Sequence, residues 1–164
     1  MMRQQAAGGF TIEVRNLQRK HKIDQGLIRD KSKAILALCG LKDVELSILI
    51  VNNRRIRILN KKYRGIDKPT DVLSFPMGEY NPPLPPFNKG GMRGLSAQPL
   101  LLGDVVLSME KIQSQAREQG HSPDCELMAL LTHGILHLIG YDHERSLQED
   151  RRMRKKEGII LAKL

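Results

Sequence analysis

The chain has 164 residues and a formal net charge of +9, from 27 lysines and arginines against 18 aspartates and glutamates. This length suits one domain with a substantial core, and the positive charge favours nucleic acid as a partner, although charge also serves solubility alone. No run of about 18 uncharged apolar residues occurs, and residues 1–10 lack the apolar stretch of a signal peptide, so we expect no contact with a membrane. The two distant cysteines, Cys39 and Cys125, indicate reduced core thiols of a soluble cytoplasmic protein.

Strand-like and helix-like patterns interleave along the chain. Residues 10–14 alternate apolar with polar side chains and predict a first strand, and the apolar spacing in 27–38 predicts a helix that ends near Gly40. The later elements are strands at 44–51, 71–75 and 101–107, the last interrupted at Gly103 and Asp104, and helices at 53–62, 109–119, 123–139 and 147–163. This order predicts an α+β domain, close to α/β, in which about five helices cover a small mixed sheet of about four strands.

The patterning shows no internal repeat and no domain boundary, so we expect one domain over residues 1–164, with a flexible segment at 1–9. Residues 81–99 form a loop rich in proline and glycine, for which a surface insertion is a simpler interpretation than a lid. On the last helix, Met153, Ile160 and Leu161 share the apolar side.

Two basic clusters lie in predicted helices. The first runs from Arg54 to Arg57 and continues from Lys61 to Arg64, and it adds to the case for nucleic acid. The second covers residues 151–156, where acidic residues alternate nearby, so an ordinary solvated helix face explains much of it.

Three of the five histidines lie within eleven residues at a spacing that suits one metal ion. His133 and His137, four apart on a predicted helix, project from one face, and a turn at Gly140 brings His143 back toward them. The helix around them is uncharged and largely apolar, so buried imidazoles there need partners, and a metal satisfies them together. Three protein ligands leave a fourth position for water, which is typical of a catalytic zinc site with one Zn²⁺ per chain.

The residue after the first histidine of the motif distinguishes two kinds of zinc hydrolase. Zinc proteases carry a glutamate there as general base, whereas this chain has Gly134. A phosphodiester substrate fits better, since zinc activates water and an arginine can stabilise the extra negative charge. Asp142 and Glu144 flank the third histidine, and either could orient an imidazole or transfer a proton, while a turn role is equally compatible with Asp142.

Several segments resemble the YbeY family of bacterial endoribonucleases. They are the histidine motif at 133–143, LNKKYRG at 59–65, KPTDVLSFP at 68–76 and LGDVV at 102–106. They occur in the family's order and span about half of the chain. The resemblance implies a zinc-dependent endoribonuclease that cuts single-stranded RNA, matures the 3′ end of the small-subunit ribosomal RNA and serves ribosome quality control.

The resemblance also implies roles for particular residues. His133, His137 and His143 would be the zinc ligands, and Arg64 would be the functional arginine, acting as a phosphate clamp. Asp71, Ser74 and Asp104 belong to the family's pattern as well, and we interpret them as structural, because short polar residues at strand ends commonly hold loops together. The implied partners are single-stranded RNA, ribosomal RNA and the small ribosomal subunit.

Two other functions remain compatible with the sequence. One is a metallopeptidase in which Glu144 or Asp142 replaces the missing base. The other is a non-catalytic ribosome-binding factor in which the metal only fastens the C-terminal helix to the rest of the domain. The sequence leaves open the oligomeric state, the identity of the metal in the cell, and whether water or the 2′-hydroxyl of RNA is the nucleophile.

Overall fold

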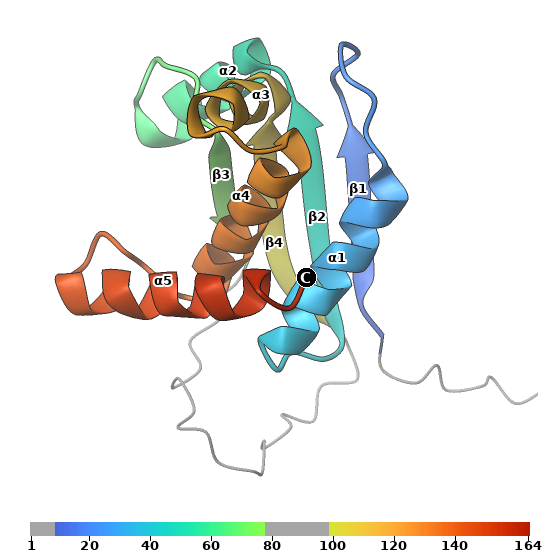
Figure 1. The fold of residues 1–164 in the computed structure, drawn as a ribbon, viewed down its shortest axis with the longest axis vertical. Coiled ribbons are helices and arrows are strands. Elements are labelled where there is room, and N and C mark those ends of the chain that lie inside the picture. Colours follow the sequence, from blue (N-terminus) through green and yellow to red (C-terminus); the bar gives the residue numbers. More distant parts are fainter. Residues whose placement is uncertain (1–8, 78–98) are drawn as a thin grey trace, which may run out of the picture.

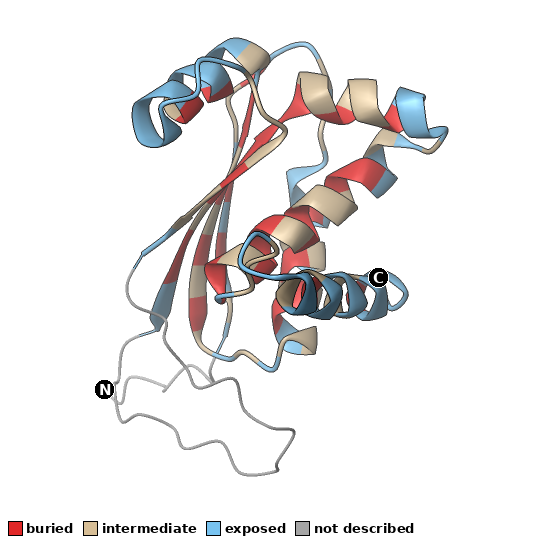
Figure 2. Ribbon diagram, turned by 90° about the vertical axis from the view of Figure 1, so that its left-hand side faces the viewer, coloured by how far each residue is buried: buried red, intermediate tan, exposed pale blue. Residues whose placement is uncertain are grey.

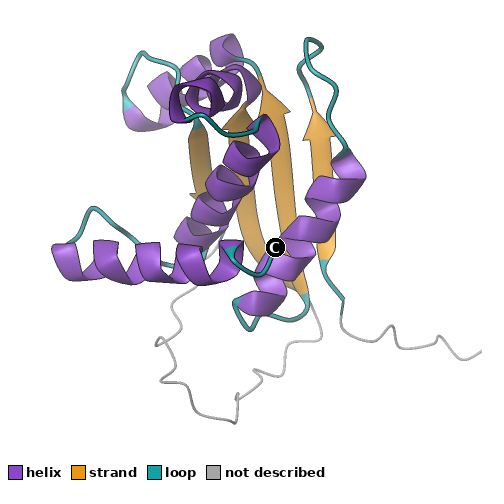
Figure 3. Ribbon diagram, in the orientation of Figure 1, coloured by secondary structure: helices purple, strands orange, loops and turns teal. Residues whose placement is uncertain are grey.

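The computed structural model describes residues 9–77 and 99–164, so all but the last residue of the segment expected to be flexible (1–9) and of the expected loop (81–99) lies outside the described residues. Nine elements follow one another in it (Figures 1 and 3). They are β1 (Thr11–Asn16), α1 (Gln25–Leu38), β2 (Val44–Val51), α2 (Asn53–Arg64), β3 (Val72–Pro76), β4 (Leu100–Ser108), α3 (Met109–Gln119), α4 (Pro123–Leu138) and α5 (Leu147–Leu161). None of the described helices combines the length and apolarity needed to cross a membrane.

The strands form one mixed sheet in the order β1-β2-β4-β3. The first three strands are parallel to one another, and β3 pairs antiparallel with β4 at the edge. Parallel neighbours need long connections, which α1 provides between β1 and β2. The predicted fold class, a small mixed sheet of four strands covered by five helices, is therefore confirmed.

Alternation along the strands gives the sheet two covered faces of unequal size. The larger core includes Ile48 of β2 and Val105 of β4, and α1, α3, α4 and α5 contribute to it. The smaller core joins Val106 of β4 and Leu73 of β3 to Ile56 of α2. Figure 2 shows the sheet between α2 on one side and the remaining helices on the other. Any group carried by α2 therefore lies across the sheet from a group carried by α4.

The fourth strand continues through the predicted interruption instead of breaking. Its pairing with β2 shifts register between Glu45 and Leu46, so that Leu102 is an extra residue on β4. Gly103, with a φ of 136°, carries the chain through this bulge in a conformation that L side chains rarely adopt. Pairing resumes at Gly103 and Asp104 and runs to the end of the strand.

Two expectations about buried side chains are wrong. Cys125 is an exposed thiol in the first turn of α4, whereas Cys39, after α1, is half-buried against the larger core, and both are free as expected. Leu161 is exposed because α5 turns only a narrow side toward the core, formed by the fully buried Met153 and Ile160.

Candidate metal centre

The fourth helix and the turn after it position the three histidines. Ser122 caps the N-terminus of α4, and His133 and His137 lie one turn apart near its C-terminal end. Gly140, with a φ of 95°, ends the helix: its own N–H donates to the carbonyl of His137, and the N–H of Tyr141 donates to the carbonyl of Leu136. The chain thereby reverses and brings His143 back to the helix.

The three imidazoles form one compact group. Each offers a nitrogen that lies within 4.8 Å of the others, and the ring centroids are 4.6 to 5.2 Å apart. The Nε2 atoms of His133 and His137 are 3.0 Å apart. This separation is short enough for both nitrogens to be ligands of one ion.

The state of the side chains fits a metal ion. Burial, followed by the neighbouring His133 and His143, lowers the pKa of His137 and favours the neutral imidazole, which is the ligand form. The Nδ1 atom of His143 is buried and has no hydrogen-bond partner among the described residues. A buried nitrogen without a partner is costly, and a bound ion would use the cluster's unpaired nitrogens. The group can therefore bind a metal ion, while its geometry leaves the choice of metal open.

A carboxylate that the sequence did not single out contacts the cluster. Glu157 of α5 accepts a hydrogen bond from Nδ1 of His133 at 2.7 Å, and both side chains are largely shielded from solvent. One signal pointed to it: Glu157 lies four residues after Met153 and three before Ile160, on the inward side of an amphipathic helix. An acidic residue on such a face needs a partner inside the protein.

Gly134 lies against the sheet, at β3 and β4. A Cβ atom there would come within 2.8 Å of Val105 Cγ1, 3.2 Å of Val72 Cγ2 and 3.3 Å of Ser74 Oγ. The Ser74 hydroxyl also donates to the Gly134 carbonyl at 3.0 Å. The close approach of α4 to β3 thus excludes the protease glutamate from this position for steric reasons.

We expect Gly134→Ala to lower the free energy of unfolding by about 1–3 kcal/mol, because the added methyl group overpacks the contact between α4 and the sheet. Urea unfolding of the two proteins, followed by circular dichroism, measures this difference. A variant as stable as the parent would show that α4 can move away from β3 without loss.

Asp142 is engaged in the turn that carries His143. Its Oδ1 accepts from the backbone N–H of Glu144 at 2.9 Å, and its Oδ2 lies 3.0 Å from Nε of Arg145. The backbone hydrogen bond is the main reason that the pKa of Asp142 is lowered. Glu144 is exposed and has no side-chain hydrogen bond among the described residues. In this arrangement Asp142 holds the loop of the third histidine, and Glu144 is the freer of the two carboxylates.

Arg64 is not brought into contact with the histidines. It is the last residue of α2, is exposed, and forms no hydrogen bond or ion pair with them within the described ranges. Beside it, the Tyr63 ring packs against Phe75 of β3, with centroids 4.9 Å apart. On the opposite face of the same strand, Ser74 bonds to α4. The helix that carries Arg64 and the helix that carries His133 and His137 therefore pack on opposite faces of β3.

Three further polar residues belong to the segments that resemble the family, and two of them, Asp71 and Ser74, form hydrogen bonds that hold the fold together. Asp71 caps the start of β3 by accepting from the N–H of Val72, and its other oxygen accepts from Gln115 of α3 at 3.0 Å. Ser74 joins β3 to α4, as described above. Asp104 lies at the resumption of β4 after the bulge.

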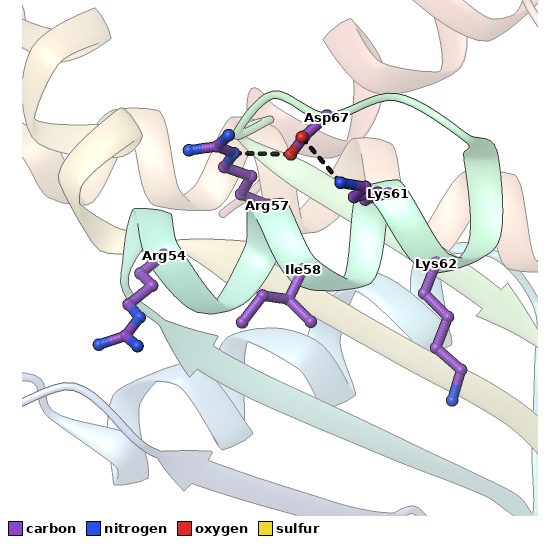
Figure 4. A pocket seen from close by; sticks show the side chains of 6 residues that line it. All are labelled: Arg54, Arg57, Ile58, Lys61, Lys62 and Asp67. Carbon is purple, nitrogen blue, oxygen red and sulfur yellow. Dashed lines mark hydrogen bonds and ion pairs between the residues drawn. The ribbon is translucent and has the colours of Figure 1, made fainter.

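A basic hollow of about 480 Å³ lies along the outer side of α2 (Figure 4). Its lining residues are Arg54, Arg57, Ile58, Lys61, Lys62 and Asp67. Asp67 accepts from Arg57 at 2.7 Å and from Lys61 at 3.0 Å, and these two hydrogen bonds lower its pKa to about 2. The carboxylate thus stays ionised at any physiological pH, and with four cations and one anion the hollow has a charge of +3.

Comparison with known proteins decides the family. The family model described as endoribonuclease YbeY matches residues 13–164, which is most of the chain. The chain belongs to the endoribonuclease YbeY family. An endoribonuclease YbeY of Aquifex aeolicus is 44% identical over 146 residues, covering 89% of this chain and 87% of that protein. One of Thermoanaerobacter sp. is 42% identical over 151 residues, covering 89% and 93%.

The fold agrees with a solved structure as well. A Thermotoga maritima protein determined in solution matches with a TM-score of 0.60 and 25% identity, covering 92% of this chain and 87% of that one. The resemblance seen in the sequence motifs is thereby confirmed, and so is the enzyme class that it implied, a hydrolytic nuclease acting on RNA.

Proposed function

We propose that this member of the YbeY family is a zinc-dependent endoribonuclease that cuts single-stranded RNA. Its role would be the maturation of ribosomal RNA, notably at the 3′ end of the small-subunit RNA, and ribosome quality control, with the small ribosomal subunit as partner and the cytoplasm as its location. The observation that carries the zinc dependence is the cluster of three histidine nitrogens within 4.8 Å of one another. The two free thiols agree with a reducing compartment.

His133, His137 and His143 would hold the zinc ion. When bound, zinc would polarise a phosphoryl oxygen and lower the pKa of a coordinated water. The chain's own contribution is to keep the His137 imidazole neutral, chiefly through burial, and to bring His143 back to the helix through the turn at Gly140. Asp142 and Glu144 would orient an imidazole or transfer a proton. Glu144 suits proton transfer better, because its carboxylate has no hydrogen bond among the described residues.

The placement of Arg64 supports a substrate that crosses the edge of the sheet. Arg64 lies on one side of β3 and the histidines on the other, so a bound strand would pass over β3 to reach both. A single strand of RNA bends readily around such an edge, whereas a stiff duplex does not. Arg64 would hold a phosphate of that strand with its guanidinium group.

The hollow on α2 extends the same RNA path away from the metal. Its cations come from the helix that ends in Arg64, so phosphates held there continue the strand held by that arginine. The exposed Ile58 between Arg54 and Lys62 offers an apolar surface to a base (Figure 4). Basic residues placed along the phosphate backbone of a nucleic acid, with apolar side chains between them, are typical of proteins that bind single strands.

The test of the proposed function is Arg64→Ala. We expect this variant to keep about one zinc per chain and to cut single-stranded RNA about 10²-fold more slowly, because it loses a charged contact to the reacting strand and no metal ligand. Metal analysis and cleavage of a labelled RNA measure the two effects. Arg55→Ala, on the same helix and outside the hollow, is the matched control and should cut at nearly the parental rate. Equal cleavage by Arg64→Ala and the parent would refute the role of Arg64.

A second prediction concerns Asp67. Asp67→Asn should tighten RNA binding, because it releases Arg57 and Lys61 and raises the charge of the hollow by one. The ion pairs are complete above the ordinary pKa of an aspartate and are lost only as pH falls toward 2, so the effect should be present across the physiological range. Fluorescence anisotropy at several salt concentrations should show a dependence on log salt that is steeper by up to about 0.7.

The control for Asp67→Asn is Asp30→Asn on α1, which removes an equal charge from an ion pair with Lys33 elsewhere on the surface. If both variants change RNA affinity equally, net charge explains the effect and the hollow has no special part in binding.

A further inference from the structure

Glu157 lies on the inward side of α5. Met153 and Ile160 on this side are 1% and 0% exposed, and Glu157 lies between them in the helical repeat. The side chain of Glu157 is 22% exposed, against 76% for that of Arg154 on the outer side of the helix. The geometry of α5 thus directs Glu157 toward α4.

The partner of this carboxylate is a histidine of the metal centre. Oε1 of Glu157 lies 2.7 Å from Nδ1 of His133, a short distance for a bond between a nitrogen and a carboxylate. A carboxylate accepts only, so the proton is on Nδ1 and the lone pair of His133 is on Nε2. That Nε2 is the atom 3.0 Å from Nε2 of His137, inside the cluster.

Nearby cations of α5 are engaged elsewhere. Arg154, one turn before Glu157, pairs with Asp150 at 2.9 Å, and Lys156 donates to the carbonyl of Leu38 at 3.1 Å. Neither forms a hydrogen bond or ion pair with the Glu157 carboxylate, whose hydrogen bond among the described residues is to the His133 imidazole. An acidic residue inside a basic helix therefore serves the metal centre and not the helix surface.

We propose that Glu157 is a positioning residue of the metal centre: it fixes the tautomer and ring direction of His133 and makes its Nε2 a stronger ligand. Carboxylates behind metal-binding histidines act in this way, and their loss commonly weakens metal affinity by about 10–100-fold. The proposal rests on the proposed zinc site. It also makes α5 part of that site, since the helix must dock on α4 for the carboxylate to reach His133.

Zinc affinity of the full chain, measured by competition with a chromogenic chelator in the absence of RNA, tests the proposal. Glu157→Ala should bind zinc about 10–100-fold more weakly than the parent, and Glu157→Gln, which keeps the shape and an acceptor oxygen, should lie between the two. Asp150→Asn removes a carboxylate of the same helix that faces an arginine, and it should keep the parental affinity. Thermal unfolding of the metal-free proteins shows whether each variant still folds.

A second readout separates positioning from a merely structural ion pair. In the metal-free parent, nitrogen-15 NMR should find His133 protonated on Nδ1, and this preference should be lost in Glu157→Ala. The unfolding midpoint of Glu157→Gln should stay near that of the parent. Zinc affinities of both Glu157 variants within twofold of Asp150→Asn, or a parental His133 protonated on Nε2, would overturn the proposal.

The outcome is independent of catalysis. A chain that binds zinc through Glu157-supported histidines and cuts no RNA would refute the proposed function and leave this inference standing. Conversely, unchanged zinc affinity in Glu157 variants that still cut RNA would refute the inference alone.

Discussion

His137→Ala is expected to remove the metal ion and, with it, RNA cleavage. His137 is the histidine whose imidazole burial keeps neutral, and its Nε2 lies 3.0 Å from that of His133, so its loss leaves two ligands that cannot enclose an ion. Zinc content should fall from about one per chain to a small fraction, and cleavage of single-stranded RNA should fall by at least about 10³-fold, because the metal-dependent step is removed and not merely weakened.

Metal analysis after dialysis and a single-turnover cleavage assay measure these two losses together. His21→Ala is a suitable control, since His21 lies in the connection between β1 and α1, far along the chain from the cluster, and its side chain makes no hydrogen bond among the described residues. It should retain zinc and cleavage. A zinc-free His137→Ala protein that cut RNA as well as the parent would contradict the role of the three histidines.

Gly103→Ala is expected to cause the largest loss of stability among single methyl additions. Its φ of 136° is strained for alanine, and a Cβ atom would lie 2.1 Å from the carbonyl oxygen of Phe75 and 3.0 Å from both Met77 N and Pro76 Cα. These are backbone atoms of the paired strand β3 and of the residue after it, so they cannot rotate away. Strain and overpacking together should lower the free energy of unfolding by about 3 kcal/mol or more, which denaturant unfolding measures.

The matched control is Gly158→Ala. Gly158 is inside α5 and has open space where a Cβ would lie, so alanine should stabilise the helix by about 0.5–1 kcal/mol. Opposite signs for the two substitutions are expected. A Gly103→Ala protein within about 1 kcal/mol of the parent would mean that β3 and β4 can separate at the bulge without cost.

The histidine cluster could be predicted because its geometry is local. A spacing of four residues on a helix and a glycine that reverses the chain determine where His133, His137 and His143 lie, whatever the rest of the domain does. The absence of the protease glutamate was also visible, but its cause was not. Only the packed structure shows that Gly134 faces Val105 across a gap too small for a side chain.

Glu157 and Arg64 were harder to place because both depend on tertiary packing. Glu157 is 24 residues from His133, and the contact exists only once α5 lies on α4. Arg64 belongs to α2, which packs on the face of the sheet formed by Val106 and Leu73, and which face a helix covers is settled only by tertiary packing. Local periodicity contains neither fact. The bulge at Gly103 could be predicted in part: the sequence indicated an irregularity at this position, but only the pairing register shows that the strand continues through it.

The measurement that tests the central claim most directly is zinc reconstitution of the metal-free parent chain, with RNA cleavage followed during the titration. The account predicts that the metal-free chain is folded and inactive, and that cleavage rises in proportion to added zinc and saturates near one equivalent, since one group of three histidines binds the ion. Full cleavage by the rigorously metal-free chain, or no cleavage after one zinc is bound, would contradict it.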